Sequence, residues 1–448
     1  MKLRLCIAAT VSFLLATDSF ASVPASEAEH LKSTLTPLGG ERAGNASGSI
    51  PAWTGGMSKT DTQVSGKRSD PFAAEKPLFV ITAKNMSQYA DKLTPGIQEM
   101  LKKYPDSYRL DVYASHRTAA APQSVYDATY QNALETKLVD SASGPMPENG
   151  KAGIPFPIPQ AGIEVMWNHL LRWRGESWRV SNTQYLTTAD GKHVLASDSH
   201  ADLQMPWYSA DGVRKDGVFW TIRMVNDGPP LRAGEAILGR ENLNAENVGA
   251  WTYLPGQRRV RRLPNACCDT PTPATAGVMS FDEMGVFSGR LDRFDWKLIG
   301  KKEMYIPYNA NKVLTAAGPT DILDDHHLKS DVVRWELHRV WVVEATLKSG
   351  KRHVMSRSTY YIDEDTWAAV LAERYDAQNA LVRVLWTTPV VFPDLPGVVS
   401  LTTGFYDLIS GAWFAADIFA GKNEQYQIVA PFKDVVFTPD ALAGEGVR

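Results

Sequence analysis

The second half of the chain contains a long series of short segments in which apolar and polar residues alternate, and this series restricts the fold more than any other feature. VFWTIRMV at residues 218–225 is one such segment. Because successive side chains of a strand point to opposite faces, alternation of this kind is typical of β-strands. The segments are joined by turn residues such as Asp190-Gly191. Together they predict a large antiparallel meander over residues 176–448.

Two turns of this meander are specified more closely by their residues. Pro255-Gly256 fits the two central positions of a type II turn, where proline and then glycine are favoured. The last hairpin is expected over residues 412–430, with its turn at residues 421–423. The sequence shows no strand–helix–strand alternation, so a parallel sheet is not expected.

Residues 81–175 have the period of helices instead, so this part is expected to be mainly helical and the whole fold α+β. Thr94-Pro95 is a typical helix start. Another helix is expected at residues 163–171, where apolar residues form a stripe directly after a proline-rich segment.

The N-terminal residues 1–21 have the features of a cleaved secretory signal peptide. Lys2 and Arg4 precede a short apolar run, and small residues end at Ala21. No cysteine follows the expected cleavage site, so a lipid anchor is not expected. Residues 22–80 are rich in Gly, Ser, Pro and Thr, which predicts an extended N-terminal arm. The formal net charge of −3 argues against nucleic-acid binding.

A cluster of four arginines, Arg258, Arg259, Arg261 and Arg262, follows the Pro255-Gly256 turn. In a regular strand two of them would point to each face. The favoured interpretation is an exposed hairpin near a sheet edge, whose arginine stems cover apolar neighbours. The alternative is a docking site for a lipid headgroup or for the acidic surface of a partner protein.

Cys267 and Cys268 are adjacent, and after signal cleavage they would be the only cysteines. Export favours disulfide formation, so a vicinal disulfide is one hypothesis. The alternative is a pair of free thiols, because adjacent Cα atoms lie about 3.8 Å apart, closer than disulfides prefer. Two ligands do not make a metal site, and no metal is expected.

The chain has thirteen tryptophans, many of them on predicted strands. They could fill a core, or they could line an apolar cavity under a wide curved sheet. Under the second interpretation the helix at residues 163–171 is the candidate plug of the cavity. The candidate cavity residues are Trp167, Leu170, Trp220, Trp251, Tyr253, Trp296, Trp335, Trp341 and Trp386.

Motifs for common enzyme chemistries are missing from the sequence. It has no nucleophile elbow, no phosphate-binding glycine loop and no dinucleotide fingerprint. The Asp-Asp-His-His run at residues 324–327 is the densest group of possible ligands or catalytic groups, and it is interpreted as a polar loop. No cofactor and no catalytic residues are therefore expected.

Three stretches resemble a known family: WTYLPGQRRVRRLP, RSTYYIDEDTWAAVLAERYDAQNALVRV and the N-terminal LTPLGGERAGNASGSIPAWTGG. They are similar to outer-membrane lipoprotein-sorting-like proteins, in a proteobacterial branch of unknown function. The resemblance implies a single LolA/LolB-like domain over residues 22–448. In that fold an incomplete antiparallel barrel, a large curved β-sheet, wraps over helices.

The resemblance also implies a function. The wider superfamily carries lipids or lipoproteins between membranes, and this branch is associated with RND-type inner-membrane exporters and an outer-membrane protein. The leading hypothesis is a non-enzymatic periplasmic carrier or chaperone of a hydrophobic ligand. The alternatives are an adaptor that docks to a transporter through its arginines, and an exported hydrolase with a site near residues 324–327.

Overall fold

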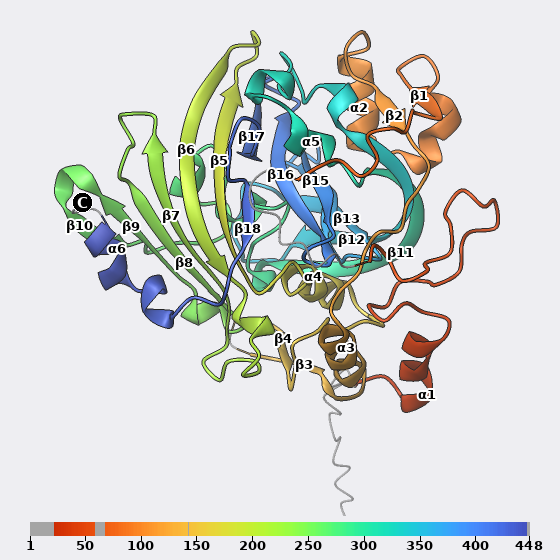
Figure 1. Cartoon of the computed structure of the whole chain (residues 1–448), viewed down its shortest axis with the longest axis horizontal. Coiled ribbons are helices and arrows are strands. Elements are labelled where there is room, and N and C mark those ends of the chain that lie inside the picture. Colours follow the sequence, from red (N-terminus) through yellow and green to blue (C-terminus); the bar gives the residue numbers. More distant parts are fainter. Residues whose placement is uncertain (1–21, 59–67, 142, 446–448) are drawn as a thin grey trace, which may run out of the picture.

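The computed structural model describes residues 22–58, 68–141 and 143–445. A large curved sheet forms most of this part of the chain, and helices lie at its edges and at one end of its curve (Figure 1). The expected signal peptide, residues 1–21, lies outside the described residues. None of the helices described has both the length and the apolar character that crossing a bilayer requires.

The sheet contains sixteen strands, and two series of antiparallel neighbours make up most of it. Each series follows the order of the chain, as expected for a meander. The first series consists of β5 (Ser177–Thr187), β6 (His193–Gln204), β7 (Val218–Gly228), β8 (Ala236–Asn242), β9 (Gly249–Leu254) and β10 (Arg259–Arg262). The second consists of β11 (Phe294–Pro307), β12 (Arg334–Leu347), β13 (Arg357–Asp363), β14 (Ala369–Tyr375), β15 (Leu381–Phe392), β16 (Gly397–Asp407) and β17 (Trp413–Ile418).

The two series join where β17 pairs with β5. At the far side of the second series, β2 (Leu110–Val112) pairs with β12 and β1 (Phe79–Ile81) pairs with β2. The pairing of β2 with β12 is parallel, so the sheet is not wholly antiparallel as expected. Among the described residues the strands of the two ends, β1 and β10, do not pair. The expected α+β fold with a large, curved, incomplete barrel is confirmed.

The prediction of a hairpin at residues 412–430 is wrong. Gly421 does turn the chain with a φ of 79°. However, β17 and β18 (Tyr426–Ile428) do not pair with each other, because both pair with β5. β5 is eleven residues long, so it offers separate stretches of backbone to both strands.

The turn before the arginine cluster also differs from the expectation. Pro255–Gln257 form a single 3-10 turn, and Arg258 adopts the left-handed conformation with φ 49° and ψ 38°. A type II turn would instead place the positive φ on Gly256. Since Leu254 pairs with Arg259, the loop has four residues, and loops of this length are usually built around a type I turn.

Helices cover the sheet at several places. They are α1 (Ala25–Ala28), α2 (Pro95–Lys103), α3 (Gln123–Glu135), α4 (Gly162–Leu170), α5 (Lys312–Thr315) and α6 (Pro439–Glu445). Thr94 caps α2 as expected, because its hydroxyl accepts a hydrogen bond from the Ile97 N–H at 3.2 Å. α4 lies at one end of the curve and α6 lies along β8, β9 and β10 (Figure 1). A separate small sheet is formed by β3 (Lys137–Val139) and β4 (Met146–Glu148).

The N-terminal arm is held by specific contacts in its described part. Trp53 is buried, and its indole Nε1 donates to the Ala119 carbonyl at 2.9 Å. Leu38 accepts a hydrogen bond at its carbonyl from the indole of Trp367, at 2.7 Å. These contacts fix the arm against the region between α2 and α3 and against the second series of strands.

Candidate ligand cavity

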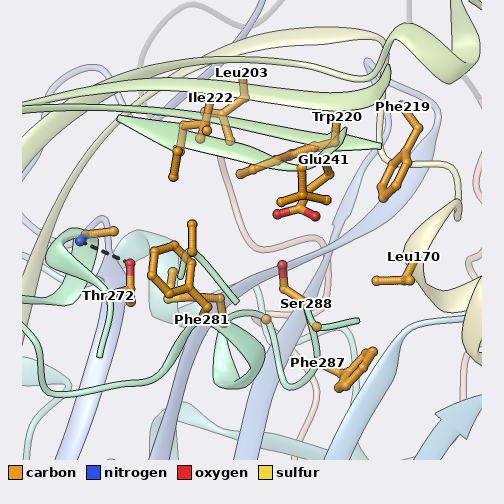
Figure 2. A pocket seen from close by; sticks show the side chains of 18 of the residues that line it. Leu170, Leu203, Phe219, Trp220, Ile222, Glu241, Thr272, Phe281, Phe287 and Ser288 are labelled. Carbon is orange, nitrogen blue, oxygen red and sulfur yellow. Dashed lines mark hydrogen bonds between the residues drawn. The ribbon is translucent and has the colours of Figure 1, made fainter. Parts of the chain in front are cut away.

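A cavity of about 220 Å³ lies under the first series of strands. One wall is formed by β5, β6, β7 and β8, and the opposite wall by the loop at residues 266–291, which precedes β11. α4 closes one side, and β16 and β17 also contribute lining residues. In Figure 2 the strand residues Leu203 and Ile222 lie across the cavity from Phe281 of the loop.

Most side chains around the cavity are apolar. Strand residues alternate, so every second side chain of β6 and β7 points inward while the next points outward. The apolar and aromatic lining includes Leu170, Val180, Leu203, Phe219, Ile222, Met224, Ile237, Phe281, Met284 and Phe287. An apolar concave surface of this kind is typical of sites for hydrophobic small molecules.

α4 holds its cavity residues through a buried histidine. Trp167 and Leu170 line the cavity, and His169 between them in the sequence is fully buried. Its Nδ1 accepts from the Ala369 N–H at 2.8 Å, so Nε2 carries the proton and donates to the Phe287 carbonyl at 2.9 Å. Burial, together with the neighbouring Arg172, lowers the pKa of His169 well below its usual value. A neutral His169 therefore links α4 to β14 and to the loop across the cavity.

A buried ion pair fixes the loop at residues 266–291. Arg374 of β14 reaches Asp282 with a nitrogen–oxygen distance of 3.1 Å, and His353 contacts the same carboxylate at 2.9 Å. Burial alone would raise the pKa of Asp282, but the charge of Arg374 and the hydrogen bond from His353 lower it far below the usual range. The loop is thus attached to the second series of strands, which keeps the cavity open beneath the first.

Two carboxyl groups in the cavity wall have raised pKa values. Burial raises the pKa of Glu241 to about 7, with a smaller contribution from Cys267. Burial also raises the pKa of Asp417 to about 7, and Asn182 donates to its Oδ1 at 2.9 Å. Glu241 points into the cavity toward Ser288 (Figure 2). Near neutral pH both groups are partly protonated, so together they carry less negative charge than two ordinary carboxylates would.

Two arginines line the cavity next to the end of α4. Arg172 is 6% exposed and donates to the carbonyl of His169. Burial lowers the pKa of Arg174 to about 10, and it lowers the pKa of Arg172 as well. Among the described residues neither arginine forms an ion pair with a carboxylate, so the buried charge of Arg172 and the partly buried charge of Arg174 have no counterion.

The structure brings three of the nine predicted cavity residues together at this cavity: Trp167, Leu170 and Trp220. Trp335 and Trp386 line a second cavity of only about 20 Å³ between α2 and the second series of strands. Trp296 and Trp341 pack elsewhere: the indole of Trp296 donates to the Leu291 carbonyl, and Trp341 lies beside Trp367.

The remaining two predicted residues lie on β9, beside the arginine cluster. Tyr253 is buried in a small core under α6 with Phe437 and Leu442. Trp251 lies within 5.9 Å of the guanidinium groups of both Arg240 and Arg262. The side chains of Trp251 and Tyr253 are therefore not part of the cavity lining.

The four clustered arginines are all exposed, on β10 and its turn. β10 is an end strand of the sheet, which explains how arginines can occupy both of its faces. Charged residues on such an edge discourage pairing with another chain. Docking of a partner or headgroup to Arg258, Arg259, Arg261 and Arg262 stays a prediction.

Cys267 and Cys268 lie next to the cavity loop as free thiols. Cys268 has a φ of 63°, in the left-handed region. The hydrogen bond from Cys268, together with Arg293 and Arg290, lowers the pKa of Cys267. The proposed vicinal disulfide stays a prediction.

The run at residues 324–327 does not converge on a catalytic or metal site. His327 Nδ1 donates to the Leu328 carbonyl at 2.6 Å, and its Nε2 accepts from the Ser107 hydroxyl at 2.9 Å. His326 stacks on Tyr104 with ring centroids 4.7 Å apart. Both histidines therefore pack against neighbouring residues, and the two rings do not face a common metal position.

One group among the described residues has the spacing of a metal site: His338, Asp363 and Asp365 have candidate ligand atoms within 4.8 Å of one another. Asp365 is held by Arg117 at 2.6 Å. His338 is held by Glu336 at 3.0 Å. Asp365 and His338 therefore belong to a buried ion-pair network, and Oδ2 of Asp363 accepts from the N–H of Thr366 at 2.9 Å.

Known proteins with a similar sequence form one family. Residues 80–443 match the family described as protein of unknown function DUF1329. The chain belongs to the DUF1329 family. A Pseudomonas aeruginosa relative, named uncharacterized protein PA3922, is 41% identical over 443 residues, which cover 97% of this chain and 96% of the relative. The expected resemblance to a family of unknown function is confirmed.

Two solved structures can be compared with this DUF1329 protein. An outer membrane lipoprotein-sorting protein domain from Vibrio parahaemolyticus has a TM-score of 0.44 at 13% identity. The alignment covers 63% of this chain and 98% of the domain. The LolA superfamily protein NE2245 from Nitrosomonas europaea has a TM-score of 0.38 at 12% identity, covering 63% of this chain and 100% of the other. The fold of this chain is established by its own strand order rather than by these alignments.

Sequence reasoning missed the polar residues of the cavity: Arg172, Arg174, Glu241 and Asp417. A signal existed for the two arginines, because RWR follows an apolar helix directly. Charged residues so close to a buried stripe indicate either a solvent boundary or a ligand site. No pattern marked Glu241 and Asp417, whose inward orientation depends on strand register.

Proposed function

We propose that this protein is a periplasmic carrier or chaperone of a hydrophobic ligand, such as a lipid, a lipoprotein or an apolar metabolite. The observation that carries the proposal is the cavity between the strand wall and the loop at residues 266–291. Its lining is mainly apolar, and it is enclosed on one side by α4. A carrier needs apolar surface that is hidden from water and still open to its cargo.

The position of α4 supports a role as the movable plug of the cavity. Trp167 and Leu170 contribute apolar surface to the lining, so a shift of α4 would change the size of the cavity. The contacts of His169 with the loop and with β14 would have to break during such a shift. Cargo exchange would then be coupled to a small number of identifiable hydrogen bonds.

The proposal is tested by mass spectrometry of protein purified from the periplasm. The organic extract of the protein and its native mass are measured in parallel. We expect a bound lipid or apolar metabolite, and its amount should fall in the variant Ile222→Phe, because Ile222 points into the cavity. Ile409→Phe is the matched control, since Ile409 is 72% exposed.

Two results would contradict the carrier function. One is a protein that arrives empty and takes up no added fluorescent fatty acid or phospholipid. The other is equal retention of ligand by Ile222→Phe and by the wild type, which would place the ligand outside the cavity.

The proposal includes cooperation with an RND-type inner-membrane exporter and an outer-membrane protein. Arg259 and Arg261 are exposed on the sheet edge and have no ion pair among the described residues, so they are free to meet an acidic surface. A photo-crosslinking residue at position 259 in intact cells should capture an envelope protein. The same photo-crosslinking residue in place of the exposed Lys84, which is outside the arginine cluster, should not. An adaptor without cargo is the alternative, and it predicts the crosslink together with an empty cavity.

A further inference from the structure

The segment that follows α4 places two arginines at the cavity in a fixed position. Tyr208 donates to the Leu171 carbonyl at 2.6 Å, and Tyr426 donates to the Arg174 carbonyl at 3.0 Å. The indole of Trp173 donates to the Pro396 carbonyl at 3.0 Å. The backbone that carries Arg172 and Arg174 is therefore anchored on both sides before any ligand binds.

The arginine side chains are only partly satisfied by this structure. Arg174 Nε is buried and has no hydrogen-bond partner. An Arg174 Nη contacts the Met205 sulfur at 3.3 Å, and a thioether is a weak acceptor. The guanidinium lies 5.7 Å from the ring of Trp178 and 6.0 Å from the ring of Trp220.

Other polar atoms in the same cavity also lack partners. Gln184 Oε1, Trp220 Nε1 and Ser400 Oγ belong to lining residues, are buried, and make no hydrogen bond to the described residues. A buried polar atom without a partner costs about 1–3 kcal/mol. A purely hydrocarbon ligand would leave these atoms without a hydrogen bond and both arginine charges without a counterion, so the lining favours cargo with a polar end.

The charge of the cavity indicates which polar end fits. Glu241 and Asp417 have pKa values near 7, so their charges can be neutralised by protons. The arginines have no carboxylate close enough to raise their pKa values, and only the phenols of Tyr208 and Tyr426 act in that direction. The cavity therefore has an excess of buried positive charge, which an anion would neutralise.

We propose that the cargo is an amphiphile with an anionic head group, a carboxylate or a phosphate, whose head binds Arg172 and Arg174. Its hydrocarbon chain lies along the wall formed by Leu203, Ile222 and Phe281. The fork of N–H groups on a guanidinium matches the paired oxygens of both head groups. This inference rests on the proposed carrier function and adds the chemical class of its cargo.

The test compares ligands that share one chain and differ in the head group. Dodecanoate, dodecyl phosphate, dodecanol and dodecylamine are titrated into delipidated full-length mature protein, and binding is followed by calorimetry. We expect the two anions to bind about tenfold or more tightly than the alcohol, because a hydrogen bond to a charged group contributes about 1.5–3 kcal/mol. The order of dodecanoate and dodecyl phosphate distinguishes a carboxylate cargo from a phosphate cargo.

Variants locate the head group. Arg174→Gln should weaken binding of both anions about tenfold or more and leave the affinity for dodecanol unchanged. Arg352→Gln is the matched control, because Arg352 is exposed between β12 and β13, and it should change none of the affinities. Near-UV circular dichroism shows that each variant is folded, and the head-group series on the wild type needs no variant.

The outcomes separate the two proposals. If all four ligands bind equally, or if dodecylamine binds most tightly, the anionic class is wrong while the carrier function stands. If Arg174→Gln binds the anions as tightly as the wild type, the head group lies elsewhere and the inference is overturned. If no ligand binds, the carrier function itself fails.

Discussion

The two halves of the curved sheet differ in how they are covered. β7, in the half that we call the open half (β5–β8), has side chains that alternate between buried and partly exposed. β14, in the filled half (β12–β15), has seven residues that are all buried. The open half faces the cavity of about 220 Å³, whereas the cavity at the filled half has about 20 Å³.

The difference shows what each half contributes. The filled half carries the loop at residues 266–291 and α4 on one face, and α2 and the N-terminal arm pack on it as well. It acts as a rigid support, because it leaves little empty volume and its buried Arg374 is paired with Asp282. The open half borders a larger empty volume beside Arg172 and Arg174, which form no ion pair among the described residues, and such a volume is what a binding site needs. Four predictions test this contrast, beginning with the largest effect.

Removing a buried charge that is paired with carboxylates of the filled half should have the largest effect. Arg117 is buried and holds Asp365 at 2.6 Å and Glu364 at 3.4 Å. Arg117→Met should lower the free energy of unfolding by about 3–5 kcal/mol, because it leaves a buried carboxylate unpaired. Urea unfolding measures the loss.

The control is an exposed ion pair on α2. Lys102 lies 2.6 Å from Glu99, and both side chains are about half exposed. Lys102→Met should therefore change the free energy of unfolding by less than about 1 kcal/mol. Equal losses in the two variants would mean that the filled half is not the rigid support.

Replacing an isoleucine by phenylalanine should lower stability in the filled half and have little effect on stability in the open half. Ile362 of β13 is fully buried in the filled half, so Ile362→Phe should cost about 1–3 kcal/mol of stability through overpacking. Ile222→Phe enters the open cavity and should change stability by less than about 1 kcal/mol. Thermal unfolding of both variants makes the comparison. A larger loss for Ile222→Phe would show that the cavity does not accommodate the ring.

The filled half also shows where sequence reasoning stops. The alternation of residues predicted a large antiparallel meander in the second half of the chain. It could not show that Glu373 and Arg374, adjacent charged residues of β14, are both buried. Glu373 accepts from the N–H of Gly96 at the start of α2 at 2.6 Å, and Arg374 reaches Asp282 in the cavity loop. Both partners lie far away in the sequence, so local pattern carries no information about them.

The candidate site was predictable only in part for the same reason. Trp167 and Leu170 could be placed at the cavity because a helical stripe has one inward face. For strand tryptophans the inward face depends on register and on what covers each face. Trp335, Trp341 and Trp386 were predicted to line one cavity, but none of them lines the cavity under the first series of strands. The parallel contact of β2 with β12 was equally invisible, since it joins segments more than two hundred residues apart.

Stability should fall as the pH rises, because of Asp417 of β17, whose carboxyl group belongs to the lining of the open cavity. The pKa of Asp417 is about 7 in the folded protein, against about 3.9 in an unfolded chain. Between these values the folded state binds more protons, so its stability is complete below pH 4 and decreases as the pH rises through 7.

The variant Asp417→Asn should remove this dependence. It should raise the free energy of unfolding at pH 8 by roughly 1–3 kcal/mol relative to the wild type and have little effect below pH 4, where the carboxyl group is protonated in both states. The asparagine keeps an oxygen for the Asn182 amide and tolerates the left-handed backbone of this position, φ 55°. Asp106→Asn, at an exposed site, is the control. The raised pKa of Asp417 would be contradicted if Asp417→Asn did not weaken the pH dependence of the free energy of unfolding.

The smallest effect is expected at an arginine that lines the open cavity, and its sign is the informative quantity. Arg174 is a partly buried charge that forms no ion pair among the described residues, whereas Arg261 is exposed on the sheet edge. In ligand-free protein Arg174→Gln should raise the free energy of unfolding by about 1 kcal/mol, because removal of the desolvated charge outweighs the lost contacts with Trp178 and Trp220. Arg261→Gln should change it by less than about 0.5 kcal/mol. Chemical unfolding of delipidated samples measures both. A clear loss of stability in Arg174→Gln would mean that Arg174 supports the fold, and the open half would then resemble the filled half in retaining buried charges for structure rather than for cargo.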